Sequence, residues 1–117
     1  MQAPEVDVPE VDVVLVNAPP EEAKKIARAI VEARLAACVN VVPGVVSIYR
    51  WEGAVHEEGE SMLLIKTRRD LVSALSRLVR EVHSYSVPEI LVLPADSARS
   101  SRAYLDWVRA ETREVPA

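Results

Sequence analysis

The sequence predicts an α+β fold, in which two helices cover one face of a four-stranded antiparallel sheet and a third helix follows. Two long apolar runs rich in β-branched residues, 39–51 and 55–66, lie on either side of Glu52-Gly53-Ala54. This pattern is typical of a β-hairpin whose turn glycine takes a positive φ. Amphipathic segments precede and follow the hairpin, and a short apolar run lies beyond each of them. The predicted order is therefore strand, helix, hairpin, helix, strand, helix.

The first strand is expected over residues 11–16, and Asn17-Ala18-Pro19-Pro20 ends it. Proline is tolerated in a first helical turn because the N–H it lacks would have no intrahelical partner. The following helix is expected to reach about Ala36. Small and apolar residues recur there at three- and four-residue steps, which predicts an amphipathic helix: Ala23, Ile26, Ala27, Ile30, Ala33 and Ala37.

The hairpin is unusually long for the domain. At about 3.3 Å per residue each arm can reach roughly 40 Å, whereas a compact domain of this length is only about 36 Å across. The hairpin should therefore overhang its domain, and another chain is expected to cover its unpaired backbone and apolar side chains. Pro43-Gly44 interrupts the first arm, which predicts a bulge. Alternation beyond the bulge places Ser47, Tyr49 and Trp51 on one face.

The second half of the chain predicts a helix over 69–83, a short strand over 88–93 closed by Pro94, and a helix over 102–112 that carries Trp107. A split βαβ arrangement accommodates this order most simply, which predicts a ferredoxin-like sandwich. One sheet face then has no helix to cover it. Together with the overhanging hairpin, that face is a second reason to expect several subunits.

Composition bounds the function. The 117 residues fit one domain, expected over 11–113, preceded by a flexible acidic tail over 1–10 in which PEVDV occurs twice in tandem. The net charge of −4 argues against nucleic acid and anionic membranes as partners. No apolar run reaches the roughly 18 residues of a membrane span. A single cysteine, Cys38, excludes an internal disulfide. We therefore expect a soluble, cytoplasmic protein.

Two candidate metal ligands each have a simpler explanation. Cys38, at a helix–strand junction, fits a buried structural thiol better than a soft metal ligand, because no second Cys or His stands at ligand spacing. His56 lies among Glu57, Glu58 and Glu60 near the hairpin turn. A solvated acidic tip explains this group, and a weak, exchangeable divalent-cation site is the alternative.

A binding cleft is the main functional hypothesis. We expect Trp51, Lys66, His83, Tyr85 and Glu89 to converge at a cleft between subunits and to receive a small ligand or a metal ion. The simpler alternatives are a cross-strand ion pair between Lys66 and Glu89, and a charge from His83 at a helix C-terminus. Enzymatic signals are absent: the sequence contains no phosphate-binding glycine loop, no Cys/His pair with an orienting group and no metal-hydrolase motif. We expect no catalytic activity.

Four motifs in this order resemble the CutA family of divalent-ion tolerance proteins: LAACVNVVPGVVSIYRWEG at 35–53, LLIKTR at 63–68, HSYSVPEI at 83–90 and YLDWV at 104–108. The resemblance covers essentially residues 11–109. It implies a ferredoxin-like subunit in a tight homotrimer whose long hairpins pair between subunits, similar to the PII regulatory proteins. Tyr49, Trp51 and Trp107 are the expected interface aromatics.

The resemblance also implies a role in tolerance of copper and other divalent cations. Some members carry proposed copper ligands, a Cys near the end of the first strand and a His pair before the tyrosine of an HPYxxPE segment. The matching positions here are Val16, Val82 and His83, so one of three donors is present. Ser84 also replaces the proline of that segment, which should loosen the loop before Tyr85.

Three functions remain open from the sequence. The first is a trimeric, non-enzymatic protein of divalent-cation response, with no required cofactor and with copper or another divalent cation bound weakly at His83 or His56. The second is a PII-like regulatory module that binds a small anion or metabolite between subunits. The third is a scaffold for another protein.

Overall fold

The computed structural model describes residues 8–115. It consists of four strands, three α-helices and one short 3₁₀ helix, and the expected order of strands and helices is confirmed. The elements are β1 (Val11–Ala18), α1 (Pro20–Glu32), β2 (Cys38–Trp51), β3 (Ala54–Arg68), η1 (Arg69–Leu71), α2 (Val72–Val82), β4 (Leu91–Pro94) and α3 (Arg102–Glu111). The first copy of the PEVDV repeat lies almost wholly outside the described residues.

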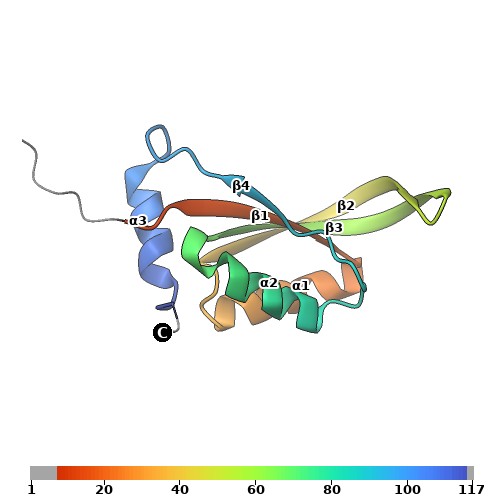
Figure 1. Cartoon of the computed structure of the whole chain (residues 1–117), viewed down its shortest axis with the longest axis horizontal. Helices are drawn as coiled ribbons and strands as arrows, with labels where there is room; N and C mark the ends of the chain where they lie inside the picture. The colour runs from red at the N-terminus through yellow and green to blue at the C-terminus, as the bar shows by residue number, and fades with distance from the viewer. Residues whose placement is uncertain (1–7, 116–117) are drawn as a thin grey trace, which may run out of the picture.

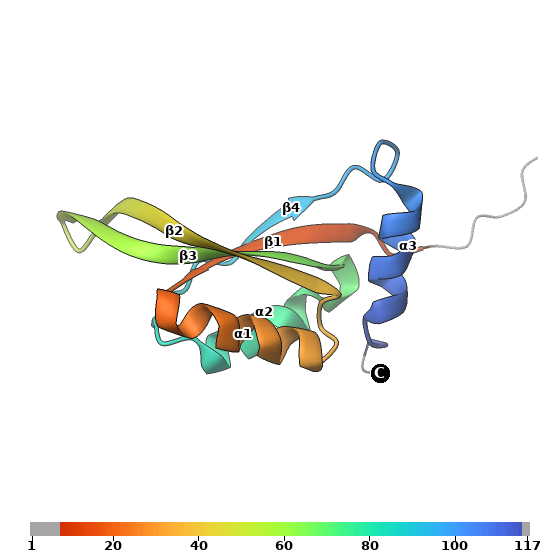
Figure 2. The ribbon, with the colours of Figure 1, turned by 180° about the vertical axis from the view of Figure 1, so that it is seen from behind.

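The four strands form one antiparallel sheet in the order β2-β3-β1-β4. Helices α1 and α2 lie side by side on one face of this sheet, and α3 stands at the end opposite the hairpin (Figures 1 and 2). This arrangement confirms the predicted ferredoxin-like sandwich with an additional C-terminal helix. On the other face α3 covers only one end, where Val11 packs against Leu105 and Val108. The rest of this face has no helix of the described residues over it, and we call it the open face.

The core lies between the sheet and the two helices. Alternate residues of β1 and β3 point toward the helices because side chains alternate across a strand. Val14 and Val16 of β1 and Ile65 of β3 are fully buried there. The helices contribute Ile26, Ile30, Leu71, Leu75 and Val79 to the same cluster. Each such side chain contributes about 1.5 to 3 kcal/mol through burial, so this layer fixes the register of the sheet.

The β2–β3 hairpin projects well beyond the helices, as predicted (Figure 1). The subunit measures 59 × 26 × 23 Å, and β3 alone has 15 residues. The pairing shifts between Val42 and Val45, which is the bulge expected at Pro43-Gly44. Trp51 pairs with Ala54, so the turn has two central residues. Both have positive φ, which is the type I′ geometry that matches the twist of a hairpin.

Helix α1 ends at Glu32, four residues before the expected end at Ala36. Arg34 takes φ 57° and stops the helix. The N–H of Arg34 donates to the Val31 carbonyl at 2.9 Å, and the N–H of Leu35 donates to the Ile30 carbonyl at 3.1 Å. This pair of bonds defines a Schellman cap, which usually uses glycine at the left-handed position. The apolar periodicity of the sequence continues past this cap, so the helix end predicted from it lies four residues too late.

The left-handed Arg34 is held by the third helix. Its guanidinium donates from Nε to the Glu111 carbonyl and from a terminal nitrogen to the Ala110 carbonyl, both at 3.2 Å. These are carbonyls at the C-terminus of α3, where a cation is favourable. Arginine therefore caps α3 while occupying a position that glycine would fill with less strain.

Several other boundaries differ from the sequence prediction. Strand β1 continues to Ala18, two residues past its expected end, and α2 begins at Val72, after the 3₁₀ turn η1. Strand β4 begins at Leu91 instead of residue 88, and its residues are exposed in the single subunit. Pro9 and Glu10, expected in the flexible tail, are held to the domain, because their carbonyls accept hydrogen bonds from Arg109 Nε at 2.8 Å and from the Arg69 N–H at 2.7 Å. The domain therefore begins before Val11.

The hairpin turn can be tested by a pair of glycine substitutions. Gly53 has φ 81°, whereas Gly59 has an ordinary φ, and a Cβ would meet no atom within 4 Å at either position. We expect Gly53→Ala to lower the free energy of unfolding by about 1 to 2 kcal/mol, because a Cβ disfavours the left-handed region. Gly59→Ala is the matched control and should be neutral or slightly stabilising. Chemical denaturation at one protein concentration measures both, and an equal loss in the two variants would contradict the assigned turn.

Candidate functional site

A cleft of about 500 Å³ lies where the hairpin leaves the sheet. One wall is the hairpin and the other is the loop between α2 and β4. The cleft is lined by ten residues from β1, β2, β3 and this loop: Asn17, Ser47, Ile48, Tyr49, Trp51, Glu60, Tyr85, Ser86, Val87 and Glu89. None of them is a lysine, an arginine or a histidine.

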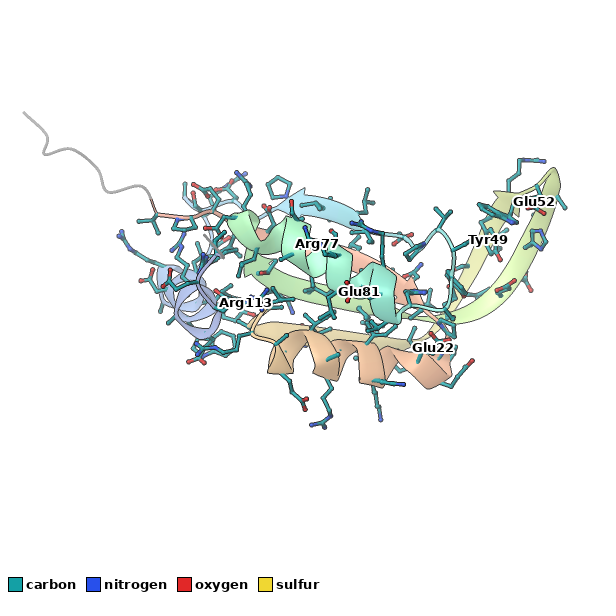
Figure 3. The ribbon with its side chains drawn as sticks, turned by 60° about the horizontal axis from the view of Figure 1, so that its bottom comes forward. Glu22, Tyr49, Glu52, Arg77, Glu81 and Arg113 are labelled. Carbon is teal, nitrogen blue, oxygen red and sulfur yellow. The ribbon has the colours of Figure 1, made fainter. Side chains whose placement is uncertain are left out.

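Strand alternation explains how the hairpin supplies one wall. Tyr49 pairs with His56 and Trp51 pairs with Ala54, so these residues share one face of the ribbon. Glu60 of β3 lies on the same face, two steps of alternation beyond His56. The strand has no bulge after Glu60, so this face continues into the open face of the sheet at Met62. The cleft and the open face therefore lie on the same side of the molecule (Figure 3 labels Tyr49 on the hairpin).

Two tyrosine–glutamate pairs organise the polar groups. The Tyr85 hydroxyl donates to Glu60 at 2.9 Å, and Glu60 is only 6% exposed. The Tyr49 hydroxyl donates to Glu58 at 2.8 Å. Burial and the bond to Glu60 raise the pKa of Tyr85 well above the ordinary tyrosine value, and the bond to Glu58 raises that of Tyr49. Both hydroxyls therefore remain protonated donors at neutral pH.

Two further polar side chains of the cleft, Glu89 and Asn17, present acceptor oxygens. Partial burial, and then the charge of Glu60, raise the pKa of Glu89 above its usual range. The side-chain Oδ1 of Asn17 is buried and has no hydrogen-bond partner among the described residues. An uncompensated buried acceptor costs free energy. The cleft thus combines negative charge with an unsatisfied acceptor, and its own lining supplies no positive charge.

His83 supports the loop and does not line the cleft. Its Nε2 lies 2.8 Å from the Asn17 carbonyl and its Nδ1 lies 3.1 Å from the backbone N of Tyr85. A carbonyl can only accept and a backbone N–H can only donate, so Nε2 carries the proton and Nδ1 is the acceptor. The ring is buried and packs against the Tyr85 ring at 4.7 Å between centroids. Neither nitrogen has a lone pair left for a metal ion.

Ser84 is tied to the first helix. Its hydroxyl donates to Glu22 at 2.6 Å and its backbone N–H donates to the same carboxylate at 3.2 Å. Figure 3 labels Glu22, which belongs to the first turn of α1. The sequence predicted a looser loop where serine replaces proline, but it did not anticipate this contact. The Glu22 carboxylate of α1 therefore holds Ser84, the residue between His83 and Tyr85.

The structure brings three of the five predicted cleft residues together. Trp51, Tyr85 and Glu89 line the cleft, and His83 lies behind Tyr85. Lys66 is six residues from Glu60 along β3, which is about 20 Å. Its Nζ lies 4.0 Å from Cys38 Sγ on the open face. A single subunit therefore does not bring Lys66 to the cleft, nor does it pair Lys66 with Glu89.

His56 and Cys38 do not form a metal cluster. The His56 ring stacks on Tyr49 at 5.4 Å, and its Nε2 is 3.3 Å from the Trp51 carbonyl. Among residues 8–115, no three His, Cys, Asp or Glu side chains are grouped so that they could hold a metal ion. Cys38 is half-buried and forms no disulfide with any described residue. No helix in the described part of the chain is long and apolar enough to cross a membrane.

Sequence reasoning missed Asn17, Ser47, Ile48, Ser86, Val87 and the placement of Glu60. Glu60 could have been found, because alternation from Tyr49 across the hairpin places it on the aromatic face. Asn17 gave no such signal, since it was assigned to the end of a strand. Its role depends on the loop that returns from α2 to cover it.

The comparisons with known proteins converge on one family. A family model described as CutA1 divalent ion tolerance protein matches residues 12–111. A divalent-cation tolerance protein CutA from Thermus thermophilus is 52% identical over 86% of this chain and 97% of its own length. Protein CutA from Homo sapiens is 47% identical over 90% of this chain, which spans only 58% of the human protein.

Solved structures agree with these matches. CutA1 from Oryza sativa superposes with a TM-score of 0.85 at 43% identity, covering 90% of this chain and 95% of that one. A PII-like protein CutA from Nostoc sp. PCC 7120, in apo form, superposes with a TM-score of 0.84 at 40% identity, covering 87% and 97%. The similarity extends over the whole β–α–β–β–α–β unit.

The tie between Ser84 and Glu22 is open to a direct test. We expect Glu22→Ala to lower the free energy of unfolding by about 1 kcal/mol more than Glu21→Ala, because it removes two hydrogen bonds from the loop. Both residues are in the first turn of α1, so the helix-dipole contribution is matched. Amide hydrogen exchange at residues 84–87 should accelerate in Glu22→Ala alone. Unchanged exchange there would show that the loop is held by other contacts.

Proposed function

The chain belongs to the CutA1 family of divalent ion tolerance proteins, and from this we propose that it is a homotrimeric, non-enzymatic protein of divalent-cation response whose ligand binds in the cleft beside the hairpin. The observation that carries the proposal is the cleft itself, which is lined by Glu60 and Glu89 and lacks any cationic side chain of its own subunit. Such a site attracts positive charge. We assign it a role in binding and signalling, since its lining contains neither a cysteine nor a histidine that could form a Cys/His or Ser/His pair.

Self-association is supported by apolar area that one subunit leaves exposed. On the open face, Leu91 and Leu93 of β4 are about half exposed, next to Leu15 and Leu64. The aromatic residues expected at the interface, Tyr49, Trp51 and Trp107, are also exposed in the single chain. The opposite side of the hairpin carries Val46, Ile48 and Val55, each more than 60% exposed. A monomer rarely leaves so much apolar area in water.

The copper site proposed for some relatives does not fit these residues. Val16 and Val82 offer no donor to a transition metal. His83, the one matching donor, uses both ring nitrogens in hydrogen bonds within its own subunit. His56 has one ring nitrogen without a contact among the described residues and lies beside Glu58 near the hairpin tip. We therefore propose that copper is no required cofactor here and that any uptake at His56 is weak and exchangeable.

A PII-like regulatory module is the second candidate function. The fold of the Nostoc protein, which is described as PII-like, favours it. An anionic ligand would need positive charge from a neighbouring subunit, because the lining of one subunit supplies none.

A location in the cytoplasm is proposed from the composition alone, since the relatives include proteins described as chloroplastic and as periplasmic.

The oligomeric state is tested by light scattering with a matched pair of lysine variants. The wild type should have three times the 12.9 kDa mass of one chain. Leu91→Lys should dissociate it, because a lysine buried without a partner in an interface costs several kcal/mol. Ser73→Lys adds the same charge to an exposed position of α2 and should stay trimeric. A folded wild-type monomer at micromolar concentration would refute the proposal.

Copper uptake is tested by titration of the two histidine variants. We expect wild-type protein to bind Cu²⁺ only weakly, with His56→Asn reducing this uptake at least about threefold and His83→Asn leaving it unchanged. The physical reason is that a metal ion takes a neutral imidazole lone pair, which His83 does not have available. Isothermal calorimetry at pH 7 measures both variants. Tight Cu²⁺ uptake that is lost in His83→Asn would place the copper site at His83 and contradict its assignment to His56.

A further inference from the structure

The cleft contains more aromatic surface than an inorganic ion needs. Tyr49, Trp51 and Tyr85 all line it, the first two from the hairpin and the third from the opposite loop. Its volume of about 500 Å³ falls within the range of small-molecule sites. The ring faces are electron-rich and attract cations, and they also cover methylene groups. The space and the rings therefore favour an organic ligand.

The polar groups of the cleft define the charge of that ligand. Glu60 is almost fully buried, and Tyr85 occupies one of its oxygens. Glu89 lies on the loop wall of the cleft, as Tyr85 does, and the Oδ1 atom of Asn17 is buried without a hydrogen-bond partner among residues 8–115. All three present acceptors. The lining also contains donors: the Tyr49 and Tyr85 hydroxyls are used by Glu58 and Glu60, while the Ser47 and Ser86 hydroxyls and the Trp51 indole N–H can donate as well. A ligand that brings its own donors and a positive charge matches this set.

We propose that the cleft binds a small organic cation, a primary ammonium group on a short aliphatic chain. This inference rests on the proposed function, because it names the chemical class of the ligand for the same site. An ammonium group has three N–H donors, which correspond to acceptors on Glu60, Glu89 and Asn17. The aliphatic chain packs against the aromatic rings.

Two other ligand classes fit less well. A bare divalent ion prefers several carboxylates or imidazoles converging on one point, and no group of three such side chains exists among residues 8–115. An anion would face Glu60 and Glu89 without a compensating cation from the lining. The organic cation is the class that uses the acceptors and the rings together.

The test compares three ligands of one length that differ in charge. Calorimetric titration of the intact wild-type protein uses 1,4-diaminobutane, 1,4-butanediol and succinate at pH 7. We expect saturable binding of the diamine alone. The indole N–H resonance of Trp51, identified by its loss in Trp51→Phe, should shift during the diamine titration. Binding of the diol with equal affinity, binding of succinate, or no binding of the diamine would each overturn the proposal.

Matched glutamate variants locate the binding. Glu89→Gln should weaken diamine binding at least about tenfold, because it removes one charge from the cleft without changing its shape. Glu57→Gln removes the same charge from the opposite face of the hairpin and should leave binding unchanged. Equal effects of the two variants would overturn the assignment to the cleft.

Light scattering on each sample separates this inference from the proposed function. A trimer that fails to bind the diamine refutes only the ligand class. A monomer, with or without diamine binding, refutes the trimeric function instead.

Discussion

The backbone ladder of β3 is the constraint on which the rest of the structure depends. Its second half lies in the sheet, paired with β1 on one side and β2 on the other, while its first half pairs with β2 alone and leaves the domain. Because β3 has no bulge, its alternation is unbroken from His56 to Lys66. The burial of Leu63 and Ile65 under the helices therefore also determines which hairpin residues face the cleft. A slip of one residue would exchange Glu60 for Gly59 at that wall.

The second wall depends on local contacts of the loop after α2. His83 is buried and bonded at both nitrogens, one to the backbone of β1 and the other to that of Tyr85. Glu22 holds Ser84 from α1. These contacts fix Tyr85 against Glu60, so the cleft is shaped by residues that do not line it. Such an arrangement is stiff, which reduces the ordering cost that a ligand would otherwise meet on binding.

Sequence reasoning predicted the fold well because each element carries a strong periodic pattern, and the helices and the hairpin are patterned at different periods. It misplaced the end of α1, since Arg34 adopts a left-handed conformation that usually indicates glycine. The cleft was predicted only through its aromatic and loop residues, Trp51, Tyr85 and Glu89. Lys66 was grouped with them because the sequence shows that it lies near the end of a strand. The end of the sheet at which it lies depends on strand pairing, which the sequence does not show. Asn17 was missed for the same reason.

Lys66 limits how the open face can be covered. It lies between Val13 and Cys38 in one row across the sheet, and no carboxylate of the described residues is within ion-pair distance of it. Covering the apolar neighbours releases water from their surfaces and is favourable. Covering the ammonium group without an acceptor would cost several kcal/mol. The surface that packs on this face must therefore offer an acceptor or leave the end of Lys66 in water. In the trimer that we propose, the neighbouring subunit would therefore have to bury the open face and satisfy its single lysine together.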